Sequence, residues 1–503
     1  MTPQGLHWLD YVIVAVYAAG MIALGWYYGR RQKDTTDYFV AGRNMNSTLI
    51  GVSLFATLLS TISYLSLPGE IINHGPVYLA GAISLIPSYY IVGYLLIPRL
   101  MAQRVTSAYE LLESNLGLGV RLTGASMFVL LRLMWMAALI YMASKALVII
   151  LGLGEEWLFG VTLVTAVVAI TYATLGGLRA VVITDLCQFL ILLSGAVLVL
   201  VTVTFSLGGF DWIPDSWDPN WDTQPLFSLD PHIRLTVVGT IVMQTVWWVC
   251  TAGADQTAVQ RYMATPNVRA ARRSFLINML ANLVVLIVLS LVGFALLGYY
   301  TMLPDRFSPG MSLEANADQL FPHYVSHYLP PGLSGLVVAG MFAAAMSSID
   351  SGVNSISAVV LTDFINRFRP PARNPANPVR TARLLALIIG VLVIGMSGFI
   401  ELVPGNFVEV AKRTLGLLLA PIFLLFFMAL FVPFATQSGT ILGAATGFMT
   451  AILVAYWEPI TGLEQISIQY IYVASLAVGL AVACGSSGLQ HMLFGNSGRP
   501  TRT

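Results

Sequence analysis

The stretch AGMFAAAMSSIDSGVNSISAVVLTDF, residues 339–364, combines an apolar background with a stripe of oxygen-bearing side chains. The spacing i, i+3, i+4, i+7 places four of them on one face of a helix: Ser347, Asp350, Ser351 and Asn354. Small residues such as Ala343 and Ala344 also suit close packing between helices, so a structural interface is the alternative. That alternative leaves the Asp350 carboxylate without a counter-charge.

The composition around this stretch excludes a soluble protein. Apolar residues make up 57% of the 503 residues, charged residues make up 10%, and the mean hydropathy is +0.78. Soluble domains carry about 25% charged residues. The chain is therefore expected in a lipid bilayer, and its net charge of +1 gives no sign of a nucleic-acid partner.

The cysteines and histidines form no metal or nucleophile motif. Cys187, Cys250 and Cys484 lie within apolar runs, as free buried thiols do. The six histidines sit in or beside polar connections. We therefore expect that the protein is not an enzyme.

Thirteen apolar stretches are long enough to cross a membrane, which takes roughly 20 residues per helix. Their approximate ranges are 8–29, 46–67, 77–98, 121–151, 157–176, 181–207, 235–258, 273–300, 333–365, 382–401, 408–432, 438–457 and 466–486. The fold class predicted is an all-α polytopic membrane protein.

Charge in the connections predicts the orientation. Most of the 25 Lys and Arg residues, Arg121 and Arg261 among them, fall in alternate connections and the C-terminal tail, whereas acidic residues cluster in 208–234. Basic loops stay in the cytoplasm. We expect a multi-pass protein of the plasma (inner) membrane with its N-terminus outside, its C-terminus inside and its first helix retained as an anchor.

Ionisable residues inside spans are costly and mark candidate functional sites. The clear cases are Asp185, Asp350 and Arg132. Asp255, Lys145 and Lys412 are weaker candidates because they lie near span ends, where a lysine can reach the interface.

The second predicted span supplies hydroxyl groups, followed by Pro68 and Gly69, which we expect to disrupt the backbone hydrogen bonding there. Its hydroxyl residues are Thr57, Ser60, Thr61, Ser63 and Ser66. Hydroxyls, carbonyls and carboxylates are the ligands that a small hard cation such as Na⁺ prefers. The residues alone therefore favour a cation site over purely structural polar packing.

Four motifs resemble the sodium/solute symporter family, and the resemblance runs from about residue 8 to residue 490. They are LLSTISYLSLPGE (58–70), TLGGLRAVVITDLCQF (174–189), ADQTAVQRYMA (254–264) and AAAMSSIDSGVNS (343–355). The first motif and the following INHG (72–75) are most similar to the branch that carries vitamins, monocarboxylates and iodide.

The resemblance implies a LeuT-like core of two inverted five-helix repeats, with one extra helix before it and two after it. The first helix of each repeat is expected to be broken near the midplane. The implied divisions are 1–43 for the extra helix and loop, 44–207 and 235–432 for the repeats, 208–234 for an outer loop, and 433–503 for the last two helices and tail.

The family's common sodium site, carried over by position, lies between helices two and nine. It comprises the carbonyls of Ala56, Leu59 and Ala344 and the hydroxyls of Ser347 and Ser348. A second cation is implied at Asp185, with Gln188, Asp350, Ser351 and Gln256 as neighbours. Asp350 stands where other members can have a hydroxyl, a departure that either strengthens this second site or couples a proton.

The resemblance also implies a substrate site. The positions are Leu58, Ser60, Ser63, Tyr78, Ala82, Arg132, Trp135 and Trp248. Arg132 is a candidate for a salt bridge to a carboxylate substrate, or equally a structural ion-pair partner.

The implied function is Na⁺-coupled symport of a small organic solute by alternating access, the solute being a carboxylate, a sugar or a vitamin-like compound. Sodium and solute are the implied ligands, and the protein is expected to act as a monomer in the bilayer. The alternatives are a cation channel, or a solute sensor on the same fold.

Overall fold

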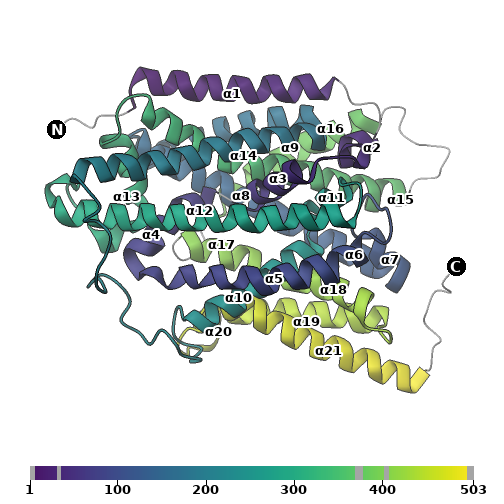
Figure 1. The fold of residues 1–503 in the computed structure, drawn as a ribbon. Helices are drawn as coiled ribbons and strands as arrows, with labels where there is room; N and C mark the ends of the chain where they lie inside the picture. Colours follow the sequence, from purple (N-terminus) through teal and green to yellow (C-terminus); the bar gives the residue numbers. More distant parts are fainter. Residues whose placement is uncertain (1–5, 31–34, 60, 369–377, 401–406, 495–503) are drawn as a thin grey trace.

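The computed structural model describes residues 6–30, 35–59, 61–368, 378–400 and 407–494, and this part of the chain forms helices and no strands (Figure 1). The elements before the first long connection are α1 (Trp8–Gly29), α2 (Thr35–Val40), η1 (Ala41–Arg43), α3 (Ser47–Leu58), α4 (Thr61–His74), η2 (Pro76–Ser84), α5 (Leu85–Tyr90), η3 (Ile91–Leu96), α6 (Ile97–Leu100), α7 (Glu110–Leu116), α8 (Leu118–Ile150), η4 (Glu155–Trp157) and α9 (Leu158–Leu207).

The remaining elements follow that connection. They are α10 (Val237–Ala254), α11 (Gln256–Met263), α12 (Val268–Met302), η5 (Pro304–Arg306), α13 (Leu313–His327), α14 (Leu333–Val359), η6 (Val360–Ile365), α15 (Asn366–Phe368), α16 (Pro378–Ser397), α17 (Phe407–Gly416), α18 (Leu419–Phe431), α19 (Gln437–Ala455), α20 (Trp457–Thr461) and α21 (Tyr470–Phe494).

The all-α membrane architecture is confirmed, but the count of thirteen spans is not. Within the described residues, ten helices are long and apolar enough to cross a membrane, and α3 with α4 makes an eleventh if the bent pair is one span. The two other expected spans correspond to the first part of α9, which breaks at Gly177 (φ 59°), and to the pair α17 and α18.

Two helices end at an extended residue of nearly the same backbone conformation. Leu59 ends α3 with φ −74° and ψ 130°, and Asp255 ends α10 with φ −76° and ψ 125°. The chain then resumes as α4 and α11, and the axes of α3 and α4 differ by 61°. These are the first helices of the two expected repeats, where breaks were predicted.

Helix α4 continues through Pro68 and Gly69, so the loss of backbone hydrogen bonding expected there does not end the helix. Gly69 instead allows a close approach of α13: a Cβ there would lie 3.0 Å from the backbone of Asp318.

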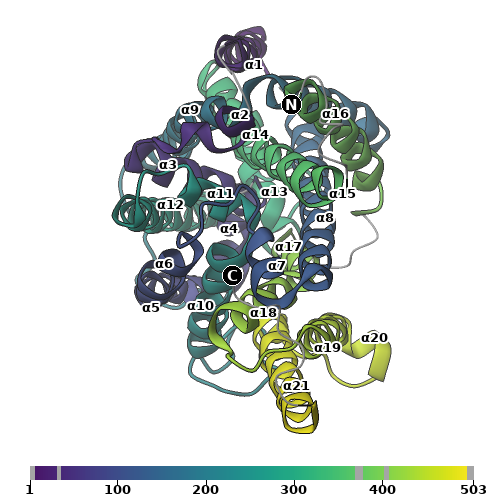
Figure 2. The same cartoon turned by 90° about the vertical axis from the view of Figure 1, so that its right-hand side faces the viewer.

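Helix α14 forms the centre of the bundle. In its most apolar window 89% of the residues are buried, against 22% for α1. Figure 2 shows α14 surrounded by other helices, with α1 on one side of the molecule and α19 and α21 on the opposite side. Gly340 brings α14 against α9, since a Cβ there would lie 3.3 Å from the Leu192 Cα.

Two basic residues that the charge pattern placed in loops are instead buried in helices. Arg261 belongs to α11 and is fully buried. Arg121, also assigned to a loop, lies near the start of α8, where it is 7% exposed and pairs with Asp363 at 2.7 Å.

Candidate ion and solute sites

The five expected ligands of the common sodium site converge where α14 crosses the break between α3 and α4. Ser347 Oγ donates to the carbonyl oxygens of Ala56 at 2.8 Å and Ala344 at 3.2 Å. Ser348 Oγ donates to the carbonyl oxygens of Thr57 at 3.0 Å and Leu59 at 3.1 Å. The extended Leu59 ends the hydrogen-bond ladder of α3, which directs these carbonyls at side chains of another helix.

This cluster has the chemistry of a site for a small cation. Its oxygens come from hydroxyls and from the carbonyls of an unwound backbone, and it is buried within the bundle. Such oxygens, without a formal charge among them, suit Na⁺ better than a divalent ion.

The expected second cation site contains an arginine of the protein itself. Arg261 Nη2 lies 3.2 Å from Asp185 Oδ2 and donates to Ser351 Oγ at 2.6 Å. Arg261 Nε donates to Ser53 Oγ at 2.8 Å, and Ser53 in turn donates to Asp185 Oδ2 at 2.5 Å. Ser351 donates to Asp350 Oδ1 at 3.1 Å, which links the second carboxylate to the group.

The structure thus brings together three residues of the predicted second site: Asp185, Asp350 and Ser351. They surround the Arg261 guanidinium, which the sequence pattern did not place in the site. We refer to these three residues with Ser53 and Arg261 as the Asp185 cluster. Within the described residues, Asp185 Oδ1 has no hydrogen-bond partner. That oxygen is the acceptor that remains for a further cation or proton.

Two other residues of the predicted set form hydrogen bonds to groups outside the Asp185 cluster. The Gln188 amide donates to Tyr17 Oη at 3.3 Å, between α9 and α1. The structure does not bring Gln256 to the group, because its amide accepts from the Ala108 N–H at 2.7 Å and donates to the Thr106 carbonyl at 2.8 Å.

Arg132 does not line the solute cavity described below. It pairs with both carboxylate oxygens of Asp255 and donates to the Thr257 hydroxyl. Asp255 in turn caps α11 by accepting from the Thr257 N–H at 2.8 Å. This geometry matches the structural alternative for Arg132, which holds the break between α10 and α11 in place.

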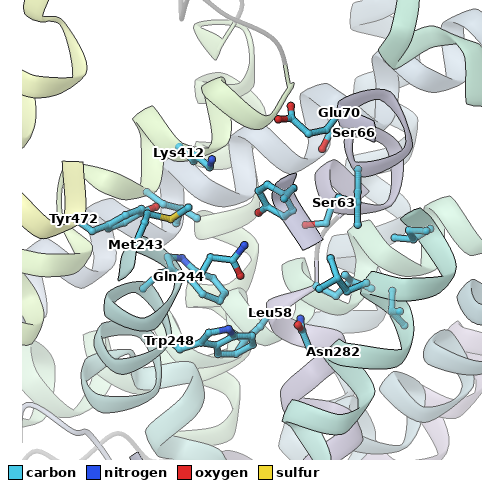
Figure 3. A pocket seen from close by; sticks show the side chains of 18 of the residues that line it. Leu58, Ser63, Ser66, Glu70, Met243, Gln244, Trp248, Asn282, Lys412 and Tyr472 are labelled. Atoms are coloured by element: carbon cyan, nitrogen blue, oxygen red, sulfur yellow. The ribbon is translucent and has the colours of Figure 1, made fainter. Parts of the chain in front are cut away.

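The candidate solute site is a cavity of about 160 Å³ next to the sodium cluster. Five of the predicted substrate residues line it: Leu58, Ser63, Tyr78, Trp135 and Trp248. Among the described residues, Ala82 and Arg132 are not part of its wall, and Ser60 lies outside the described residues. In Figure 3 the polar ends of Ser63, Gln244, Asn282 and Lys412 face the space between helices.

Several lining residues were missed from the sequence. They are chiefly Glu70, Gln244, Asn282 and Lys412. The sequence predicts that Lys412 reaches the membrane–water interface. In the structure it is 8% exposed, and its Nζ lies 5.3 Å from the Tyr78 ring centroid. The position of Lys412 inside the apolar segment 408–432 is the sequence feature that could have identified it as a buried residue.

An ion pair separates this cavity from a second one of about 260 Å³. Glu70 lines both cavities and accepts two hydrogen bonds of 2.8 Å from Arg234. Burial alone would lower the pKa of Arg234, but the hydrogen bonds and charge of Glu70 outweigh burial and raise it. The pair is therefore charged and closes this side of the solute site.

The comparisons with known proteins agree with this architecture. The family model "Sodium:solute symporter family" matches residues 38–447. The chain is 28% identical to the sodium/sialic acid symporter SiaT of Proteus mirabilis over 89% of this chain and 90% of that protein. It is 29% identical to the human sodium-coupled monocarboxylate transporter 1 over 90% of this chain and 74% of that protein.

The fold is also that of a solved transporter. The structure of a substrate-bound, outward-open Na⁺-coupled sialic acid symporter superposes with a TM-score of 0.80 at 25% identity, covering 96% of this chain and 98% of that one. The LeuT-like architecture implied by the resemblance is thereby confirmed. The chain belongs to the sodium:solute symporter family, whose members couple solute transport to Na⁺.

Proposed function

We propose that this protein accumulates a small organic solute by alternating access, with Na⁺ bound between α14 and the α3–α4 break as the driving ion. One observation carries the proposal. Leu59 lines the solute cavity, while its carbonyl oxygen accepts a hydrogen bond from Ser348 in the sodium cluster. An ion at this cluster therefore fixes the backbone that forms part of the solute wall.

Coupling follows from this shared residue. An ion that binds one conformation more tightly shifts the population towards that conformation by its differential affinity. Sodium that ties α14 to the break completes the cavity wall at Leu58 and Leu59, which raises solute affinity in the same state. Each entering charge gains about 2.3 kcal/mol at 100 mV, and a tenfold sodium gradient adds about 1.4 kcal/mol.

We propose a second cation in the Asp185 cluster. Two carboxylates, Asp185 and Asp350, share this cluster with one guanidinium, so the three groups carry a net negative charge. A monovalent cation or a proton there offsets the remaining charge. Two sodium ions would supply roughly 7 kcal/mol, enough for about a 10⁵-fold gradient of a neutral solute.

The remaining expectations stand as part of the proposal. The repeats span 44–207 and 235–432, and the protein acts as a monomer in the plasma membrane. Helix α1 begins and helix α21 ends at opposite ends of the bundle (Figure 1). This arrangement supports an outside N-terminus and a cytoplasmic C-terminus. Membership of the family does not favour a channel.

Uptake into proteoliposomes tests the proposal. Vesicles with and without an inward sodium gradient would be screened against monocarboxylates, sugars, vitamins, amino acids and sialic acid. We expect accumulation of one solute class only with the gradient. Equal uptake in its absence would contradict sodium coupling.

A further inference from the structure

Among the described residues that line the solute cavity, Lys412 is the one with a cationic side chain. It is 8% exposed, and α17 places its side chain beside Tyr78. A buried ammonium group requires hydrogen-bond acceptors or an anion. Within the described residues, no carboxylate lies within ion-pair distance of Lys412.

The neighbouring acids are already held by another cation. Both oxygens of Glu70 accept hydrogen bonds from Arg234 at 2.8 Å. Glu409 lies 3.7 Å from Arg234 Nε. These acids act on the Lys412 charge only through space, so the donor hydrogens of Lys412 stay available to a bound molecule.

A second donor faces the same space. Gln244 Nε2 is buried and has no hydrogen-bond acceptor within the described residues. Figure 3 places its amide between Lys412 and Asn282. An ammonium group with an adjacent amide donor matches the two oxygens of a carboxylate.

The rest of the wall determines the body of the ligand. Trp135, Trp248, Leu286 and Tyr472 give the cavity a largely apolar and aromatic lining. Its volume of about 160 Å³ is close to that of a cavity of roughly 150 Å³ that holds benzene. The site therefore suits a compact apolar group that carries one charged end.

We infer that the transported solute is a small monocarboxylate, with its carboxylate on Lys412 and Gln244 and its apolar body against Trp135 and Trp248. This inference rests on the proposed function and names the substrate class for the same cavity. Arg132 is already paired with Asp255 and Thr257 at the break between α10 and α11, so the inference assigns the carboxylate contact to Lys412 on α17 instead.

Pairs of acids and their amides test this inference in proteoliposomes. Nicotinate with nicotinamide, benzoate with benzamide and propionate with propionamide differ in charge but scarcely in size. We expect sodium-driven uptake of at least one acid, with its amide disfavoured roughly tenfold or more. Lys412→Gln should raise the KM for that acid roughly 10- to 100-fold and remove the preference over the amide, whereas Lys412→Arg should keep it.

Arg413→Gln is the matched control, because it removes a positive charge from the next residue, whose guanidinium faces Tyr456. It should keep the preference for the acid. Sodium-driven uptake confined to amides or sugars, or an acid preference that survives Lys412→Gln, would overturn the carboxylate inference while leaving sodium coupling intact.

Sodium binding is measured separately, as a sodium-dependent rise in the thermal unfolding midpoint of the purified protein. If that rise is present but no acid is transported, the carboxylate inference is wrong. If sodium neither stabilises the protein nor drives any flux, the proposed function itself fails.

Discussion

Ser348 on α14 donates a hydrogen bond of 3.1 Å to the carbonyl of Leu59, the extended residue that interrupts the second predicted span. The same Leu59 lines the solute cavity. The Ser348 hydroxyl, in the centre of the bundle, thus contacts a residue of the cavity wall. In the proposed function, this contact couples ion binding to solute binding.

Arg261 of α11 pairs with Asp185 of α9 and donates to Ser53 of α3 and Ser351 of α14, so it links four helices. Breaking the Arg261–Asp185 pair should therefore destabilise the fold. Arg261→Met leaves Asp185 buried without its counter-charge, which costs about 3–5 kcal/mol. We expect a clearly lower thermal unfolding midpoint in detergent. Arg261→Met with Asp185→Leu should recover part of the loss, because both buried charges are then removed.

Arg269→Met is the control for this comparison, since Arg269 is exposed near the start of α12. It should leave the unfolding midpoint unchanged. An Arg261→Met protein that unfolds at the wild-type temperature would refute the structural role of the pair.

Asp350 should contribute to the second cation. Asp350→Asn removes one of the two carboxylates of the Asp185 cluster, so the cluster no longer carries a net negative charge. We expect a lower Hill coefficient for sodium-driven uptake and about tenfold weaker apparent sodium affinity. Ser355 lies on the same helix as Asp350 and donates to Gln260 of α11, so Ser355→Ala serves as the control and should keep the wild-type coefficient. An unchanged sodium dependence in Asp350→Asn would reject the second site.

His323 should make the fold sensitive to acid. Burial, with a smaller effect of His327, lowers the pKa of His323 to about 4. In the unfolded chain a histidine takes up a proton near pH 6.5, so stability is present above that pH and is lost as pH falls towards 4. The loss should be on the order of 2 kcal/mol.

Unfolding midpoints measured from pH 8 to pH 4.5 check this dependence. His323→Gln removes the titrating group and should flatten the profile, whereas His327→Gln should retain most of the slope. Equal acid sensitivity in His323→Gln and the wild type would assign the effect to other groups.

Patterns within single helices predicted much of the fold, and the family resemblance implied the ligands of the sodium cluster. The 3.6-residue period identified the face of Ser347 and Ser351, and the motifs located the break near Leu59. Both signals are local, since helical spacing and a broken helix depend on neighbours in sequence.

What the sequence missed depends on contacts between distant segments. The sequence pattern placed Arg261 in a loop because its partners, Asp185 and Ser53, are far away in the chain. Lys412 read as a residue near a span end because only tertiary packing places it beside Tyr78. The sequence alone does not distinguish the two roles of Arg132, because its partner Asp255 is also distant in the chain.

The sodium dependence of uptake in Ser348→Ala tests whether Na⁺ binds between α14 and the α3–α4 break. The control is Ser357→Ala, which removes a buried hydroxyl of α14 that has no hydrogen-bond partner within the described residues. We expect Ser348→Ala to raise the sodium concentration for half-maximal uptake about tenfold or more, while Ser357→Ala matches the wild type. Uptake with wild-type sodium dependence in Ser348→Ala would contradict binding at this site.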